Sequence, residues 1–338
     1  MKYLVLFILA TSLSQVPMHS NAQGIGNFEL YKKIPVPGNG GYDYMFLDTM
    51  SNHLYVSHGT NVTVIDLKTE QIVGTIDNMK GVHGIAIAPE FQKGFISDGD
   101  GNAVAVFDLQ TLKIINTIPI TGKDPDAIMY EPYSKQVFAF CGHSQNACVI
   151  NAATMAQTKT IALDGSPEFA VSDGAGKIYN NLEDKNEIVV LDSKAGTILK
   201  RFPLDPCGGP TGLAIDLNHQ RLFTVCRKNK GMTVIDFASG KVITTLPIGT
   251  AVDAVSYDAN TGLIICSNGD GTATIIKQDN ADQYTVLQTL TTQWKAKTHA
   301  FDPRTKTIYF SAFDLQSDNK TRIPGSFKVL VYKMKSSV

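Results

Sequence analysis

Seven positions along this chain of 338 residues, about 42 residues apart, carry side chains suited to binding a ligand or a cation. Six of them are ionisable, and four of these are acidic. The seven are Asp43, His83, Asp126, Glu168, Thr211, Asp253 and Lys297. Carboxylates and an imidazole that converge are suitable ligands for Mn, Fe, Zn or Ca. Asp43, His83, Asp126 and Glu168 are therefore the candidate ligands of a divalent cation, and we expect them to lie on one arc.

A repeated pattern of short apolar runs must position these side chains. Two or three apolar residues are followed by Asp or a substitute, a few polar residues and a further apolar run, with a period of about 42 residues. In the second repeat this pattern predicts strands at 85–88, 94–97, 103–107 and 113–118. The dipeptides Asp100-Gly101 and Asp270-Gly271 are typical of hairpin turns between such strands.

A period of about 42 residues with four short strands predicts an all-β protein, a seven-bladed β-propeller with four antiparallel strands per blade. The segment 28–34 has the character of a fourth strand and has no repeat before it. The last repeat, 298–334, lacks such a strand. We therefore expect the N-terminal strand to complete the last blade and close the ring, which removes exposed sheet edges.

The second strands resemble a known family. Tyr55-Val56-Ser57-His58, Phe95-Ile96-Ser97-Asp98 and Phe223-Thr224-Val225 are similar to the Tyr-Val-Thr-Asn signature of YVTN-type repeats, and Val64 to Thr69 is also typical of them. Over its whole predicted mature length the chain resembles the YncE-like exported seven-bladed propellers. The resemblance implies the repeat class and leaves the ligand open.

In a propeller the first strand of each blade lines the central channel, so the seven recurring positions should surround one channel mouth. They could bind a cation or a small polar ligand there, or simply solvate a wet opening. The same face should carry a long loop at 314–326 that includes Lys320 and Arg322. Trp294 is expected in a nearby turn, either as a stacking surface for a ligand or packed between blades.

The N-terminus predicts export. Met1-Lys2 gives a positive start, 3–10 is apolar, and Ser20-Asn21-Ala22 offers a cleavage site, so we expect a signal peptide over 1–22 and one propeller domain over 23–338. The apolar run is too short to span a membrane. The predicted location is periplasmic or secreted, as a monomer. A formal net charge of −1 argues against nucleic acid as the partner.

Five cysteines remain after the leader, so at least one is unpaired in an oxidising compartment. Cys207–Cys226 and Cys141–Cys148 are the two bridges that the strand positions suggest. Among the histidines, His58 and His143 are expected near the channel mouth. His53 and His219 should lie at the opposite face, and His299 should be buried in a strand.

These observations favour a non-catalytic binding scaffold whose ligand, a small polar molecule or a protein, binds at the channel mouth. The chain has no Gly-x-Ser-x-Gly, His-Glu-x-x-His or phosphate-binding Gly-x-x-x-x-Gly-Lys motif. The alternative is a metal-dependent lyase or hydrolase that uses the acidic and histidine positions. Related propellers, the streptogramin lyases and lactonases, use channel-mouth residues in this way. A haem protein is disfavoured because Cys-x-x-Cys-His is absent.

Overall fold

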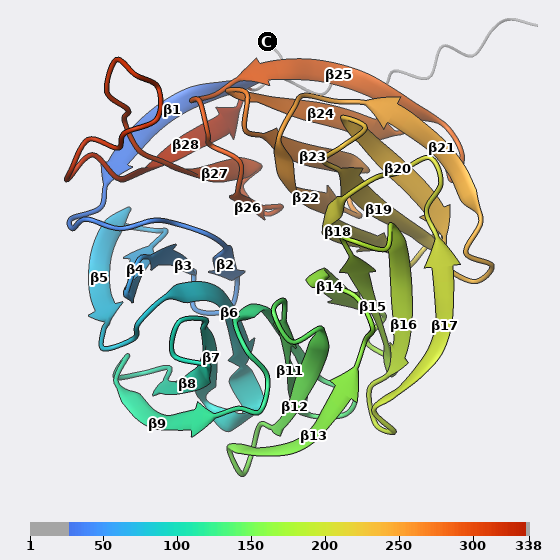
Figure 1. Cartoon of the computed structure of the whole chain (residues 1–338). Helices are drawn as coiled ribbons and strands as arrows, with labels where there is room; N and C mark the ends of the chain where they lie inside the picture. The colour runs from blue at the N-terminus through green and yellow to red at the C-terminus, as the bar shows by residue number, and fades with distance from the viewer. Residues whose placement is uncertain (1–26, 336–338) are drawn as a thin grey trace, which may run out of the picture.

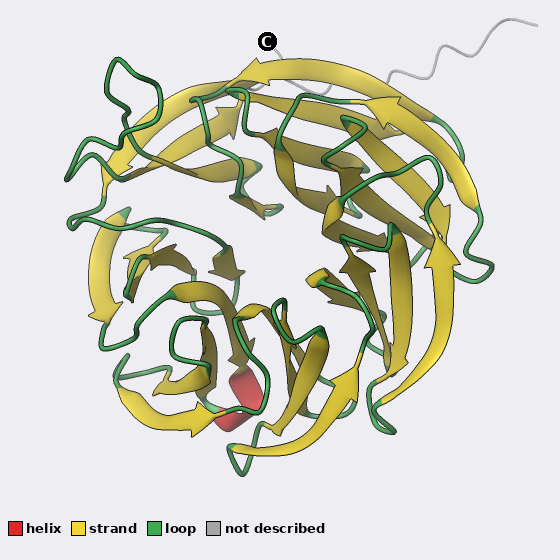
Figure 2. Cartoon of the chain, in the orientation of Figure 1, coloured by secondary structure: helices red, strands yellow, loops and turns green. Residues whose placement is uncertain are grey.

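Seven antiparallel sheets of four strands each surround a central channel in the computed structural model, which describes residues 27–335 (Figure 1). Within these residues the one helical element is η1 (Pro89–Phe91), a single turn after the first strand of blade 2 (Figure 2). The predicted all-β, seven-bladed propeller is therefore confirmed. The expected signal peptide over 1–22 lies outside the described residues. Between 27 and 335, no helix has the length and apolar character needed to cross a bilayer.

Blades 1 to 6 follow one another along the chain, and each runs from the channel to the rim. Blade 1 comprises β2 (Met45–Asp48), β3 (His53–His58), β4 (Asn61–Asp66) and β5 (Gln71–Ile76). Blade 2 comprises β6 (Val82–Ala88), β7 (Lys93–Asp98), β8 (Ala103–Asp108) and β9 (Ile114–Pro119). Blade 3 comprises β10 (Pro125–Glu131), β11 (Gln136–Cys141), β12 (Asn146–Asn151) and β13 (Ala156–Ala162). Blade 4 comprises β14 (Pro167–Ser172), β15 (Lys177–Leu182), β16 (Glu187–Asp192) and β17 (Thr197–Pro203). Blade 5 comprises β18 (Pro210–Asp216), β19 (Arg221–Cys226), β20 (Gly231–Asp236) and β21 (Val242–Pro247). Blade 6 comprises β22 (Val252–Asp258), β23 (Leu263–Asn268), β24 (Thr272–Gln278) and β25 (Tyr284–Thr291).

Blade 7 joins the two ends of the described chain. It consists of β26 (His299–Asp302), β27 (Thr307–Ala312), β28 (Lys328–Met334) and, outermost, β1 (Phe28–Pro35). Strand β1 pairs antiparallel with β28, with Phe28 opposite Met334 and Ile34 opposite Val329. The predicted closure of the ring by the N-terminal strand is confirmed, and Figure 1 shows the blue strand beside the red one.

The core lies between neighbouring blades. Second and third strands such as β7 and β8 are buried along nearly their whole length, because the next sheet covers each face. In one such layer Val104 and Val106 of blade 2 belong to the same apolar cluster as Val137 and Ile150 of blade 3. Fourth strands such as β9 expose alternate residues at the rim. The apolar runs of the sequence are thus explained by sheet-on-sheet packing.

The Asp that ends four of the seven third strands has a structural role. In blade 1 the Asp66 carboxylate accepts hydrogen bonds from the backbone N–H of Lys68 and Thr69 and from the Thr69 hydroxyl. Asp108 makes the same contacts with Thr111 in blade 2. These bonds replace backbone partners that a tight turn lacks, so the recurring Asp-x-x-Thr pattern fixes the hairpin between third and fourth strands.

One of the two suggested disulfides is present. Cys207, in the turn before β18, is bonded to Cys226 at the end of β19. The suggested Cys141–Cys148 bridge is wrong, because both residues are free cysteines. The pairing register explains why: Cys141 lies opposite Asn146, and Cys148 lies opposite Ala139, so the two cysteines are diagonal neighbours. Diagonal side chains on paired strands lie farther apart than the Cβ–Cβ distance of a disulfide.

Candidate binding site at the channel mouth

The recurring polar residues lie where the first strand of each blade begins. In blades 2 to 6 they are the second residue of the strand, and Asp43 and Lys297 lie just before β2 and β26. In each of the five blades the pairing with the second strand shifts register at this point, for example between Val82 and Ile85. Such a bulge bends the strand and re-aims its side chains. The local backbone therefore places these residues at the mouth.

Buried polar side chains on the second strands fix the backbone of this ring. The Ser97 hydroxyl donates to the carbonyl of Asp126 at 2.5 Å, and the Asn181 amide donates to the carbonyl of Thr211 at 2.7 Å. Ser267 binds the carbonyl of Lys297 in the same way at 2.5 Å. In each case the bond crosses to the next blade, so ring residues are held by the neighbouring sheet as well as by their own.

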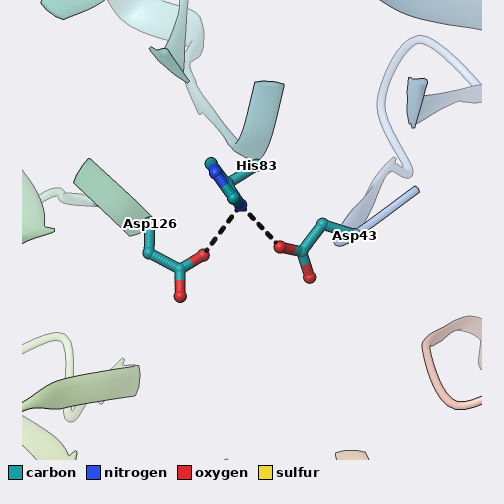
Figure 3. Close-up of side chains that lie close together, drawn as sticks. All are labelled: Asp43, His83 and Asp126. Atoms are coloured by element: carbon teal, nitrogen blue, oxygen red, sulfur yellow. Dashed lines mark hydrogen bonds and ion pairs between the residues drawn. The ribbon is translucent and has the colours of Figure 1, made fainter. Parts of the chain in front are cut away.

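Asp43, His83 and Asp126, from three consecutive blades, converge on one point (Figure 3). The Nδ1 atom of His83 lies 2.7 Å from Oδ2 of Asp43 and 3.4 Å from Oδ1 of Asp126. One ligand atom from each residue lies within 4.8 Å of the other two. The Oδ1 atom of Asp126 is buried and makes no hydrogen bond within the described chain. Three of the four residues that were expected on one arc therefore meet at one point.

A glycine keeps the His83 ring uncovered. Gly99 follows β7 directly, and a Cβ atom there would lie 2.7 Å from the Cδ2 and Nε2 atoms of the ring. Any larger residue would have to displace the imidazole. On the same side, Oδ1 of Asp124 lies 4.0 Å from Nε2 of His83. The cluster thus has three carboxylates around one imidazole.

The environment of the cluster raises the pKa values of both His83 and Asp126. Burial alone would lower the pKa of His83, but the hydrogen bond to Asp43 and the charges of Asp126, Asp43 and Asp124 outweigh it and raise the pKa to about 9. Burial and the charge of Asp43 raise the pKa of Asp126 to about 7 against the effect of His83. At neutral pH the imidazole is therefore a cation between carboxylates, and a metal ion would replace its proton.

Glu168 extends the acidic arc without joining the cluster of ligand atoms. Burial, followed by the charges of Asp126, Glu183 and Asp253, raises its pKa to about 9. Burial and the charges of Asp126 and Glu168 also raise the pKa of the Tyr44 hydroxyl well above its usual value. The Tyr44 ring lies 5.5 Å from that of Phe169, between ring centroids, and below the mouth these two residues line apolar hollows of the channel.

The opposite arc is neutralised by ion pairs. Asp253 contacts both Arg227 and Lys297, and Arg227 also contacts Glu183 at 3.0 Å. Thr211 takes no part in the site. Its side chain is buried, with the hydroxyl near the carbonyl oxygens of Val225 and Val252. Of the four residues predicted to hold a cation, three converge, and Glu168 lies beside them.

Sequence reasoning missed Glu183, Arg227 and Asp124 as members of the mouth. Glu183 and Arg227 occupy the position directly after the second strand, which Gly59, Gly99, Gly142 and Gly269 occupy in four other blades. The same register comparison that identified the ring would have found these two, because both are large charged residues where most blades have glycine.

The long loop and Trp294 lie on the same side of the propeller as the mouth residue Lys297, as predicted. The loop connects β27 with β28, and a bridge between Leu315 and Arg322 closes it (Figure 1, upper left). Arg322 packs over the Phe313 ring at 4.6 Å. Lys320 lies on the exposed loop tip, where its N–H donates to Asp318. Trp294 is 52% exposed, so it is not packed between blades.

The remaining histidines occupy separate environments. His299 is buried between the hydroxyls of Ser256 and Ser267, at 2.8 Å from each, and burial lowers its pKa to about 3. His58 is buried against Phe327, and His143 is exposed beside Asp124. His219 binds Asp216 at the far end of β18. None of these adds a ligand atom to the His83 cluster.

Comparison with known proteins supports the fold alone. No family model matches the chain, and no curated protein sequence matches it. Among solved structures, a chain of Kuenenia stuttgartiensis hydrazine synthase is similar, with a TM-score of 0.71 and 14% sequence identity. The match covers 97% of this chain and 100% of the other. A likeness at this identity shows a shared seven-bladed propeller and carries no statement about activity.

Proposed function

We propose that this protein is an exported, non-catalytic binding propeller that holds a divalent cation at the channel mouth through Asp43, His83 and Asp126. The single observation behind the proposal is the convergence of one nitrogen and two oxygen ligand atoms within 4.8 Å. Imidazole nitrogen with carboxylate oxygen suits Mn, Fe or Zn, and an open mouth leaves coordination positions for a small polar ligand. The bound cation would let a negatively charged ligand approach the acidic arc.

Export is part of the proposal and has two supports. The first 22 residues have the pattern of a cleavable leader. The Cys207–Cys226 disulfide suits an oxidising compartment. The YVTN-type, YncE-like assignment is likewise proposed, from the second-strand residues. Ser57 and Ser97 at the third position of that motif contact the backbone of Asp43 and Asp126, which gives the motif a role in building the mouth.

A metal-dependent lyase or hydrolase is the second candidate, and Glu168 favours it. A carboxyl group with a pKa of about 9 holds its proton at neutral pH and could donate it to a leaving group. A bound cation would supply Lewis acidity beside it. The two candidates share the cation and differ in whether a substrate is turned over.

The test is thermal unfolding during titration with MnCl2, ZnCl2 or CaCl2 after treatment with a chelator. A ligand at 100 times its dissociation constant stabilises the native state by about 2.7 kcal/mol. We expect one or more of these ions to raise the melting temperature of the parent protein and to leave that of His83→Ala and Asp126→Asn unchanged. Affinity should increase from pH 6 to pH 9, because the metal competes with the His83 proton.

The matched control is His219→Ala. His219 has the same 2.7 Å contact between Nδ1 and an Asp oxygen, but at the opposite end of a first strand. This variant should keep the full response to metal. If the parent shows no shift, or if the His83 and His219 variants respond alike, the cation proposal is wrong. Metal-dependent turnover that Glu168→Gln abolishes would favour the enzyme over the scaffold.

A further inference from the structure

A second hollow lies beside the channel mouth, between blades 6 and 7. It has a volume of about 370 Å³ and includes Tyr42, Trp294, Lys295, Lys297, Phe313 and Arg322 in its lining. Ligand pockets for small molecules typically start at about 300 Å³. Three aromatic rings and three cations thus surround a space that would fit a molecule with one ring.

The aromatic wall is held in place by backbone bonds. The N–H groups of Thr292 and Lys295, on either side of Trp294, donate to the carbonyls of Gly271 and Gly269 at 2.7 and 2.8 Å. This fixes the turn while the indole stays half exposed. An exposed indole on a fixed turn is a flat apolar surface that water covers poorly.

The aromatic floor is equally well anchored. Tyr42 donates its hydroxyl hydrogen to the carbonyl of Lys295, and its ring lies 5.4 Å from that of Phe313 and 5.8 Å from that of Phe327, between centroids. The hydrogen bond joins the segment before blade 1 to the turn before blade 7. A ligand would therefore meet preformed aromatic surfaces and would not need to order them.

The hollow carries unbalanced positive charge. Neither Arg322 nor Lys295 forms an ion pair with any acid in the part of the chain that the structure describes. Lys297 is neutralised by Asp253. Asp270, the one carboxylate among the lining residues, is occupied by the N–H and hydroxyl groups of Thr250 and Thr272. Arg322 and Lys295 thus face the hollow without an ion-pair partner among the described residues, and with Asp270 as the single carboxylate of the lining they leave it with excess positive charge.

We propose that this hollow binds a small aromatic anion, with the ring stacked on Trp294 and a carboxylate or phosphate group paired with Arg322 and Lys295. The Arg322 guanidinium offers a planar fork of donors that matches either group in a bidentate manner. The ring of the ligand would replace water on the indole. This site is separate from the proposed cation cluster and does not depend on a bound metal.

Fluorescence provides a direct test, because Trp294 is the single tryptophan of the chain. The chelator-treated protein would be titrated with benzoate and phenyl phosphate as ring-bearing anions. Benzyl alcohol supplies the ring alone, and acetate and inorganic phosphate supply the charge alone. We expect saturable changes in Trp294 emission with a ring-bearing anion, and binding at least tenfold weaker for the three partial probes. The tighter of benzoate and phenyl phosphate identifies the anionic group.

Two variants on the same loop complete the test. Arg322→Gln should weaken binding of the better probe at least tenfold, since it removes a charge-assisted contact. Lys320→Gln removes the same charge outside the hollow and should bind as the parent does, which also controls for the folding of the loop. The proposal is overturned if neither ring-bearing anion saturates, if benzyl alcohol binds as well, or if Arg322→Gln binds like the parent. Because the chelator removes metal, failure here leaves the cation proposal unaffected.

Discussion

At the scale of single residues, the channel mouth has more acid than the fold can neutralise. Asp253 has two cationic partners, Arg227 and Lys297, whereas Asp43 and Asp126 share the one imidazole of His83. Glu168 lies between these two arrangements. The folded state therefore retains protons there that an unfolded chain would release at neutral pH. Such excess acidity is a property of sites that bind cations or protons.

The raised pKa of Glu168 predicts how the stability of the protein depends on pH. Its pKa of about 9 in the folded protein lies above the value of about 4.3 for an unfolded chain. Its contribution to stability is thus complete below pH 4.3 and falls as the pH rises toward 9. In chelator, Glu168→Gln should melt at least about 2 °C above the parent at pH 9, and the two should converge at pH 4. Melting curves from pH 4 to pH 9 measure this.

A suitable control is Glu29→Gln, which removes an exposed carboxyl group on β1. Its melting temperature should follow that of the parent across the whole range. If the difference between Glu168→Gln and the parent does not change with pH, then Glu168 is ionised in the folded protein and the account of the acidic arc is wrong.

At the scale of the strand, a small side chain on one strand of a blade can be compensated by a large side chain at the paired position of the neighbouring strand. The second residue of the second strand is large and apolar in six blades, but blade 2 has Gly94 there. Its partner on β8 is Phe107, where blade 3 pairs Val137 with Ile150. A Cβ at Gly94 would lie 2.0 Å from the Phe107 ring. The phenylalanine therefore fills the space that the glycine leaves.

This exchange predicts strong coupling in a double-mutant cycle. Gly94→Val alone should destabilise by about 3 kcal/mol through overpacking, and Phe107→Ile alone by about 2 kcal/mol through a cavity. The double variant recreates the blade 3 pair and should recover most of the loss, which denaturant unfolding would measure. Losses that simply add would show that the two side chains do not share one space.

At the scale of the whole molecule, β1 ties the last blade to its neighbours. Phe28 is 1% exposed, and its ring meets Phe301 of blade 7 edge-on at 6.4 Å. Its backbone N–H and C=O both bond to the Gln288 side chain of blade 6. The strand thus closes blade 7, contacts blade 6 and covers the edge that β28 would otherwise expose.

Closure of the ring by β1 predicts that a single residue on this strand affects the stability of the whole propeller. Phe28→Ala should lower the free energy of unfolding by about 3 kcal/mol, because it leaves a cavity where two blades meet. Leu30→Ala, on the same strand, should cost far less, since Leu30 is 46% exposed. Urea unfolding of the two variants measures the difference. Equal losses would mean that β1 contributes through its backbone pairing alone.

The sequence alone was sufficient to predict the seven blades and the closing strand, and it placed Asp43, His83, Asp126 and Glu168 on one arc, of which the first three converge. It could do so because each blade repeats one pattern of four strands, and alignment of the seven repeats identifies where each strand begins and ends. The strand positions suggested both Cys207–Cys226, which is present, and Cys141–Cys148, which is not, because a diagonal offset depends on how one hairpin pairs.

Only the tertiary structure decided which mouth residues act together. Thr211 turns into the wall and Asp253 is neutralised, because bulges aim each side chain and hairpins from other blades supply Glu183 and Arg227. The same holds for the hollow at Trp294, which combines turns of blade 6, the turn before blade 7, the segment before blade 1 and the bridged base of the long loop. These segments are far apart in the chain, and closing the ring is what brings them into contact.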